Sequence, residues 1–176
     1  MNVLALDLAR TTGFAYGRAG DVPESGSVRL KKPDEPPGVA CFNIMAFLSD
    51  RLVFWRPDIV AVEDFLNPVA QPSAAAAIQQ LMLHGAAEGL LRSHSIRFEK
   101  VAAATWRKHY LGQANAGERG KTKAMVLARA RLLGHIPRLS DDEDRAEACG
   151  IHDWACATFA RRSHTTALHL FGESAA

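Results

Sequence analysis

Acidic residues stand at three points far apart in the sequence, and two of these points close apolar runs. Asp7 lies in VLALDLARTTG, Glu63 lies in DIVAVEDF, and a late cluster reads SDDEDRAEACGIHDWA. A carboxylate at the end of a buried strand costs desolvation free energy unless protons, hydrogen-bond donors or a metal ion compensate its charge. Several such carboxylates in one chain predict a shared metal ion.

Helical spacing sorts the acids of the late cluster. Asp144 and Glu147 are three residues apart and therefore share a helix face. Asp153 lies about 180° round the helix from Asp144, at roughly 100° per residue, and is a poor partner. The candidate ligands are therefore Asp7, Glu63, Asp144 and Glu147.

The start of this helix gives the other acids of the cluster a different role. Ser140 and Glu143 have the spacing of a capping box, which predicts a helix that begins near Asp141 and runs to about residue 161. Acids in a first helical turn commonly serve only the helix dipole, and we interpret Asp142 and Glu143 in this way. Asp141 is kept as a reserve ligand.

The ligand types favour one kind of metal chemistry. Two-metal hydrolysis of a phosphodiester needs several carboxylates that converge on divalent ions about 3.5–4 Å apart. Hard oxygen ligands favour Mg²⁺ or Mn²⁺ over zinc, and no Cys or His pair in the chain has metal-ligand spacing. The pattern therefore indicates a magnesium- or manganese-dependent phosphodiesterase.

Composition sets the class of protein. The chain has 176 residues, 48% of them hydrophobic, which suits one domain with a substantial core. We expect that domain at residues 1–161 and a loosely held tail at 162–176. No uninterrupted apolar run of about 18 residues is present, so we expect a cytoplasmic protein without a membrane partner. Three cysteines without CxxC spacing argue against a disulfide framework.

Charge is segregated along the chain. Residues 92–138 hold eleven Lys or Arg against two Glu, a net charge of +9, which leaves −7 for the rest of a chain whose total is +2. A basic surface beside an acidic pocket is the layout that a metal-dependent nuclease needs for a polyanionic substrate. A solvated helix face with ordinary charges is the alternative.

Hydrophobic periodicity predicts an α/β chain in the order βββαβαβ followed by helices. Val3, Ala5 and Asp7 alternate with three leucines, so Asp7 is expected on the strand face opposite them. The segment TWRKHYLGQANAGERGKTK is interpreted as a flexible basic connection that could approach a phosphate backbone, because it contains Gly112, Gly117 and Gly120, and a plain surface loop is the alternative. The predicted strands span 2–9, 13–17, 25–30, 58–63 and 95–100, and the helices span 39–55, 72–92, 121–133 and 141–161.

Five segments together resemble a RuvC-type Holliday-junction resolvase, in its phage- or prophage-borne branch. They are DLARTTGFAYG, VAVEDF, QPSAAAAIQQLMLHGAAEGLL, TWRKHYLGQANAGERGKTKAMV and DRAEACGIHDWA. The resemblance implies an RNase H-like fold with a five-stranded mixed sheet, three antiparallel strands followed by two parallel ones. It also implies a homodimer that cuts four-way DNA junctions with two Mg²⁺ or Mn²⁺ ions per active site. Its metal-binding catalytic acids would be Asp7, Glu63, Asp144 and Glu147.

The sequence departs from this family at two places. The last acid is more often Asp in a DxxD pattern, so either Glu147 is a longer substitute or Asp144 with Asp141 carries the site. The aromatic residue that opens the junction usually follows the central-strand Glu by three residues, where this chain has Leu66. Phe65 precedes it, and base stacking and core packing both remain open for its side chain.

The resemblance also assigns the nucleic-acid contacts. Lys121 and Lys123 match basic residues near a helix start and would approach the scissile phosphate. Arg107 and Lys108 would contact the flanking backbone, and Arg119 belongs to the same basic set.

Three other functions remain open. The same fold serves nucleases that act on RNA or on other branched DNA, and a carboxylate site attacks any phosphodiester. A junction-binding protein without catalytic activity is the non-enzyme alternative. Sugar kinases and actin-like ATPases also begin with a strand, an Asp and a Thr-Thr-Gly turn, but they generally need two such domains.

Overall fold

Five strands form one mixed sheet in the order β3-β2-β1-β4-β5. The computed structural model describes residues 1–65, 73–115, 117 and 120–160. β1 and β2 pair antiparallel, as do β2 and β3, whereas β1, β4 and β5 run parallel. This confirms the predicted sheet of three antiparallel strands followed by two parallel ones. The strands are β1 (Asn2–Asp7), β2 (Thr11–Arg18), β3 (Glu24–Arg29), β4 (Ile59–Glu63) and β5 (Arg97–Val101).

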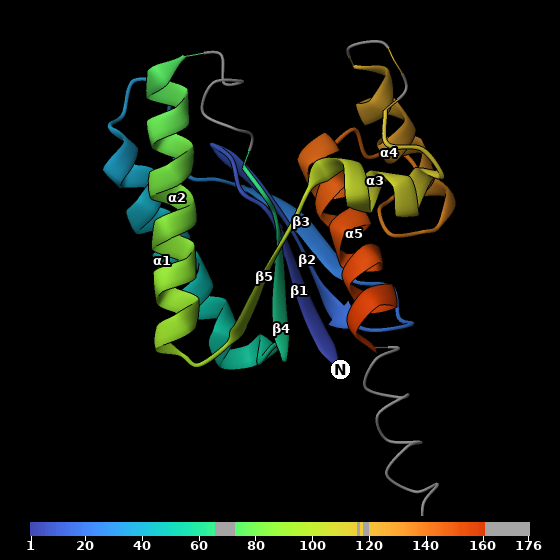
Figure 1. Cartoon of the computed structure of the whole chain (residues 1–176), viewed down its shortest axis with the longest axis horizontal. Helices are drawn as coiled ribbons and strands as arrows, with labels where there is room; N and C mark the ends of the chain where they lie inside the picture. Colours follow the sequence, from blue (N-terminus) through green and yellow to red (C-terminus); the bar gives the residue numbers. More distant parts are fainter. Residues whose placement is uncertain (66–72, 116, 118–119, 161–176) are drawn as a thin grey trace, which may run out of the picture.

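Helices cover both faces of the sheet (Figure 1). α1 (Pro37–Trp55) and α2 (Ala74–Ser93) lie together on one face. α3 (Ala103–Leu111), α4 (Lys121–Leu132) and α5 (Glu143–Ala155) lie on the other, and α5 packs directly on β1 and β2. A short π-helical turn, Cys156–Ala160, follows α5.

Alternation along β1 divides the core into two layers. Val3 and Ala5 pack in the cluster under α5, while Leu4 and Leu6 pack in the cluster under α1 and α2. Successive side chains of a strand point to opposite faces, so this division follows from the sequence pattern. It places Asp7 on the α5 face, as predicted.

α1 is amphipathic in its packing although its composition is apolar. Among the described residues it is the one helix long and apolar enough to cross a membrane, and a core helix of a globular protein has the same properties. Its Ala40, Ile44, Leu48 and Leu52 are buried against the sheet. That stripe has the spacing of a helix that covers the core of a globular domain.

The predicted capping box at the start of α5 is wrong. Asp142 is the N-cap, and its carboxylate accepts a hydrogen bond from the backbone N–H of Arg145 at 2.9 Å. The helix therefore begins at Glu143. Both Ser140 and Asp142 are good N-cap residues, and the choice falls on Asp142 because its second carboxylate oxygen also binds β3.

α3 replaces part of the predicted flexible connection, which is a second correction. Trp106 and Tyr110 are four residues apart and both are buried, so one face of the segment packs on α5. Gly112 ends the helix with a positive φ of 78°. The lysines and arginines around Trp106 obscured this stripe in the sequence.

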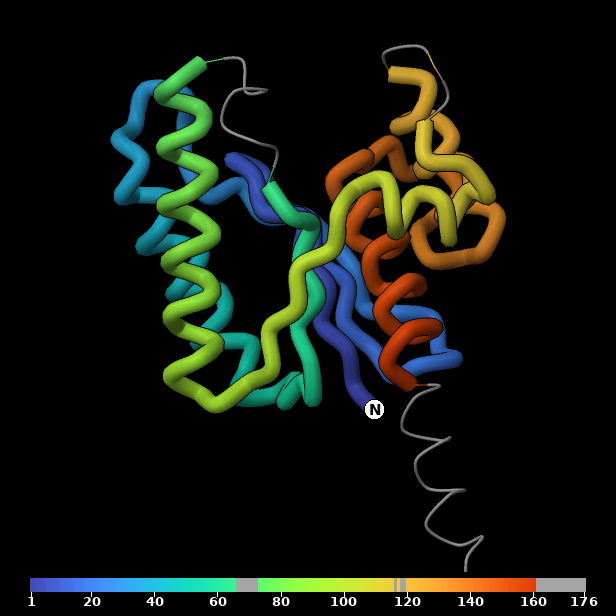
Figure 2. Tube along the Cα trace, in the orientation of Figure 1, coloured from blue at the N-terminus to red at the C-terminus, as the bar shows by residue number. Residues whose placement is uncertain are grey.

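The chain passes from the sheet to the α5 side directly after β5 (Figure 2). Only Ala102 separates β5 from α3, so the end of the edge strand delivers α3 to the region where β1 and β4 also end. Residues 162–176, predicted as a tail, lie outside the described residues. The domain boundary near residue 161 therefore stays a prediction.

Candidate active site

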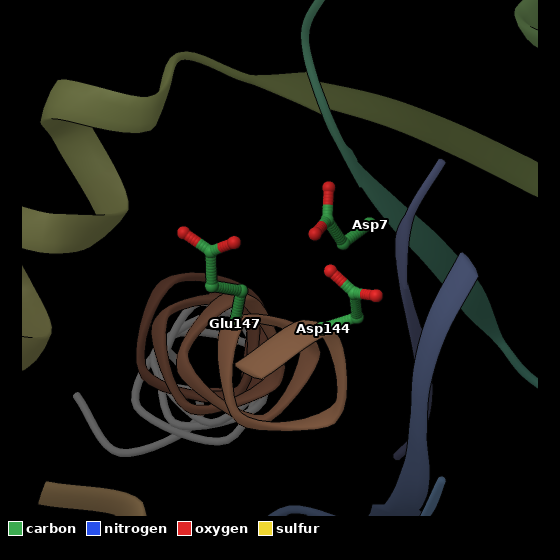
Figure 3. Close-up of side chains that lie close together, drawn as sticks. All are labelled: Asp7, Asp144 and Glu147. Atoms are coloured by element: carbon green, nitrogen blue, oxygen red, sulfur yellow. The ribbon is translucent and has the colours of Figure 1, made fainter. Parts of the chain in front are cut away.

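Three carboxylates converge where β1 ends. Asp7 is the last residue of β1, and Asp144 and Glu147 project from the first two turns of α5 toward it (Figure 3). One ligand atom from each lies within 4.8 Å of the others, and this is the one such acidic or His/Cys group among the described residues. Asp141 is exposed and outside this group, and Asp153 instead contacts His109 Nε2 at 2.9 Å.

A glycine makes this convergence possible. Gly13 on β2 is the register partner of Asp7. A Cβ at Gly13 would lie 1.9 Å from the backbone carbonyl oxygen of Asp144, far inside van der Waals contact. Only a residue without a side chain lets α5 approach the hairpin this closely. The glycine of the Thr-Thr-Gly segment therefore lets α5 lie close to β2, next to the end of β1 that carries Asp7.

Two serines of β3 fix the start of α5. Ser27 Oγ donates a hydrogen bond to the Asp142 carboxylate at 2.7 Å, and Arg145 Nε donates one to Ser25 Oγ at 2.9 Å. The N-cap is thus tied to the third strand as well as to its own helix. These contacts fix the rotation of α5 about its axis, which turns Asp144 and Glu147 toward Asp7.

Glu63 ends β4 next to this cluster but is held by other partners. Its Oε2 accepts a hydrogen bond from Trp106 Nε1 at 2.6 Å and lies 3.8 Å from Arg107 Nη2. Glu63 is not part of the compact group of three acids. The predicted set of four acids is therefore arranged as three plus one.

Two basic residues lie inside the acidic site. Arg107 Nη2 donates to Glu147 Oε1 at 2.8 Å, and its Nε is buried without a hydrogen-bond partner among the described residues. Lys123 Nζ lies 3.2 Å from Glu147 Oε2 and 3.6 Å from Glu143 Oε2. Sequence analysis assigned both cations to nucleic acid, and here they balance the charge of the carboxylates.

The other predicted nucleic-acid residues have different positions. Lys121 and Lys108 are exposed, on α4 and α3 respectively. Arg119 lies outside the described residues. Phe65 is partly buried, with its ring 5.3 Å from that of His84 and Lys100 Nζ 5.7 Å from its centroid. The Phe65 ring thus packs against α2 and β5 in this structure, which favours the core-packing interpretation. Base stacking by Phe65 stays a prediction.

The pKa values of the acids show how crowded the charges are. Burial, followed by repulsion from Glu147, raises the pKa of Asp7 well above its usual value. Burial also raises the pKa of Glu63, although Arg107 and the Trp106 indole oppose the change, and the pKa of Asp144 rises mainly through burial. Burial by itself would lower the pKa of Lys123, but nearby Glu147 outweighs it and the pKa rises. The site therefore has more negative charge than its two cations neutralise.

This donor set fits a hard divalent cation. It consists of carboxylate oxygens without a cysteine or histidine, which suits Mg²⁺ or Mn²⁺ better than zinc. A divalent charge among these oxygens would relieve the repulsion that raises the pKa values of Asp7 and Asp144.

Two residues that shape the site were not foreseen as functional. Trp106 was quoted only within a basic connection, and Gly150 only within the last helix. A Cβ at Gly150 would lie 2.6 Å from Cζ3 of Trp106, so the indole fills the place that a side chain would take on α5. The Trp-Arg pair that follows the last strand was the available signal, because an apolar ring beside a cation suggests a buried charged contact.

Comparison with solved structures identifies the fold. The structure of RuvC from Thermus thermophilus matches with a TM-score of 0.71 at 19% identity, over 93% of this chain and 97% of that one. The chain has the fold of RuvC. A structure of T. thermophilus RuvC in complex with a Holliday junction substrate matches with the same TM-score at 18% identity, over 92% of this chain and 96% of that one.

A eukaryotic protein shares the RuvC fold as well. The yeast mitochondrial Holliday junction resolvase matches with a TM-score of 0.62 at 11% identity, over 94% of this chain and 82% of that one. No protein-family model matches the sequence, and no curated protein is detectably similar to it in sequence. The structural comparison thus confirms the RuvC-type fold that the five sequence segments predicted.

Proposed function

We propose that this protein is a divalent-metal-dependent endonuclease that resolves four-way DNA junctions. The observation that carries the proposal is the convergence of Asp7, Asp144 and Glu147 at the end of β1, on a fold shared with RuvC. One of the matching RuvC structures holds a Holliday junction substrate. A structural role alone would not explain three crowded carboxylates that the fold leaves short of positive charge.

The four acids have distinct places in the proposed chemistry. Asp7, Asp144 and Glu147 would hold one cation, and Glu63 beside them would complete a site for two. Bound Mg²⁺ or Mn²⁺ supplies an activated water and stabilises the leaving oxygen of the phosphodiester. Asp7 lies between the α5 acids and β4, so its carboxylate would contact both halves of the site.

The basic residues are proposed to place the DNA backbone. Lys121 and Lys108 are exposed and free to contact phosphates. Arg107 and Lys123 would keep the acidic site from repelling the substrate, since both lie within 4 Å of Glu147. A four-way junction has no unique sequence, so its recognition would rest on phosphate geometry.

A homodimer is proposed because a resolvase must cut two strands. α2 exposes Ile78, Leu81 and Met82, while its Leu83 and Ala87 are buried against α1 and the sheet. The helix thus has one apolar side in the core and a second facing solvent. An isologous interface on this outer side would pair two active sites. The cytoplasmic location and the phage- or prophage-borne origin stay predictions.

Incubation with labelled substrates tests the function. The protein would be mixed with a four-way junction, a linear duplex and an RNA–DNA hybrid, each with Mg²⁺ or Mn²⁺ and with EDTA. We expect paired symmetric nicks on the junction alone, and only with the metal. Cleavage of the hybrid or of all branched substrates would instead support a nuclease of broader substrate range.

Asp7→Asn is the decisive variant. It should reduce cleavage by at least about 10³-fold and leave junction binding intact, because it removes a metal ligand and no basic residue. Without metal, its free energy of unfolding should exceed that of the wild type by about 0.5–2 kcal/mol, because the substitution removes a crowded negative charge. Its unfolding temperature should therefore not be lower than that of the wild type. Full cleavage by a well-folded Asp7→Asn protein would contradict the proposed site.

A further inference from the structure

Of the described residues outside the four predicted acids, Trp106 makes the shortest hydrogen bond to one of these acids. Its side chain is completely buried, and its Nε1–H donates to Glu63 Oε2 at 2.6 Å. A buried indole N–H needs an acceptor, and a buried carboxylate oxygen needs a donor. Each group therefore satisfies the other, and the Glu63 side chain is held in one orientation.

The indole is itself fixed by the helix that bears the other acids. Its ring lies against Gly150 of α5, where a Cβ would approach within 2.6 Å. Gly150 is three residues after Glu147, so the same helix positions Glu147 and Trp106. Arg107, the next residue of α3, donates to Glu147 at 2.8 Å. α3 thus connects the acid on β4 to the acids on α5.

We propose that Trp106 is a positioning residue that orients Glu63 for cation binding. The hydrogen bond occupies Oε2 and leaves Oε1 of Glu63 for the cation. Hydrogen bonds to ligating carboxylates fix ligand orientation, and their loss typically costs about 10–100-fold in metal affinity. Glu63 stands apart from the compact group, so its orientation depends on this contact more than on the other acids.

The matched control is a second indole–carboxylate pair in the same chain. Trp55 Nε1 donates to Glu24 Oε2 at 3.2 Å, and Trp55 is also nearly fully buried, under the opposite face of the sheet. Trp55→Phe removes an indole–carboxylate hydrogen bond on the sheet face opposite the acids. It should lower stability less than Trp106→Phe, because water can replace the indole N–H at Glu24, whose side chain is 56% exposed, and it should leave cation affinity unchanged.

Mn²⁺ titration of the DNA-free protein tests the proposal. Cation binding would be followed by calorimetry and by the rise of the unfolding temperature with Mn²⁺ concentration. Trp106→Phe should weaken Mn²⁺ binding about 10–100-fold, while Trp55→Phe leaves it unchanged. In a Glu63→Gln background Trp106→Phe should have no further effect, because the residue acts through Glu63.

An isosteric replacement covers the case in which Trp106→Phe does not fold. Benzothienylalanine at position 106, in a Trp55→Phe, Trp154→Phe chain, keeps the two-ring shape against Gly150 and has sulfur in place of N–H. It should weaken Mn²⁺ binding relative to Trp106 in the same background. Equal affinities, or a loss that persists without Glu63, would overturn the inference.

This inference rests on the proposed metal-dependent function, and the titration separates the two. If the wild-type protein does not bind Mn²⁺, the proposed function fails together with the inference. If the wild type binds Mn²⁺ and both Trp106→Phe and Trp55→Phe bind it with the wild-type affinity, the inference alone fails.

Discussion

His84 is a buried histidine with no hydrogen-bond partner for either ring nitrogen among the described residues. Burial, followed by nearby Lys100, lowers its pKa to about 4, although Asp64 and Glu88 oppose the change. The folded protein thus holds this imidazole in its neutral form, with its ring against Phe65. Protonation of His84 therefore favours the unfolded chain.

The stability of the protein should consequently depend on pH below neutrality. Neutral His84 contributes its full stability above pH 6.5, and this contribution is lost as the pH falls from 6.5 to about 4. The loss amounts to about 3 kcal/mol at most. Urea unfolding at pH 7 and pH 4.5 should show a smaller pH effect for His84→Leu than for the wild type.

The matched control is His94→Leu, since His94 is exposed directly after the same helix. Burial also lowers the pKa values of His135 and His152, so part of the acid sensitivity should remain in every variant. Equal pH dependence in His84→Leu and the wild type would contradict this assignment.

At the scale of elements, the position of α5 is the property on which the site depends. The helix is capped by Asp142, tied to β3 by serines and seated on β2 at Gly13. Each contact restricts a different motion of the helix. Displacement of an acid by about 1 Å can cost a metal site or an enzyme as much as 10²-fold.

Gly13→Ala should displace α5 from the sheet. Its Cβ would overlap the Asp144 carbonyl oxygen, so we expect a loss of about 1–3 kcal/mol in stability and at least tenfold weaker Mn²⁺ binding. Gly38→Ala is the control, because a Cβ at that helical position meets no atom within 4 Å. Thermal unfolding and Mn²⁺ titration of the two variants provide the comparison, and similar results for both would refute the role of Gly13.

Much of the fold could be predicted from the sequence because its periods are clear. Alternation in residues 2–9 places Asp7 on the correct face, and Pro57 correctly separates α1 from β4. The end of β4 at Glu63 and the shared face of Asp144 and Glu147 also follow from local spacing. These features are determined by residues that are close together in the sequence, so local patterns are enough to predict them.

The rest depends on contacts between distant segments. The Trp-Arg pair marks Trp106 as a residue of interest, but it does not indicate that the indole reaches Glu63, 43 residues earlier. Arg107 reads as a phosphate contact because its charge is visible and its partner Glu147 is not. The choice between Ser140 and Asp142 as N-cap was likewise decided by β3, through Ser27.

At the scale of the whole molecule, the outer side of α2 predicts an interface. Leu81 is 43% exposed beside Ile78 and Met82, on a helix whose opposite side is buried in the core. Leu81→Glu should weaken the proposed homodimer about 100-fold or more, equivalent to about 3 kcal/mol. Sedimentation equilibrium at micromolar concentration measures the change, and Val22→Glu, at a 65% exposed site after β2, is the control.

Two further outcomes are informative for the dimer. Loss of self-association in Leu81→Glu should convert paired nicks into single nicks, because each protomer carries one set of acids. A wild-type protein that sediments as a monomer would contradict the proposed interface.

The acidic site joins the seventh residue of the chain to residues 144 and 147. During synthesis, the hairpin that carries Asp7 leaves the ribosome long before α5 is made. The nascent chain therefore has no complete set of acids until nearly all of the described sequence has been translated. A chain terminated before α5 would therefore lack Asp144 and Glu147 and could not assemble this acidic group.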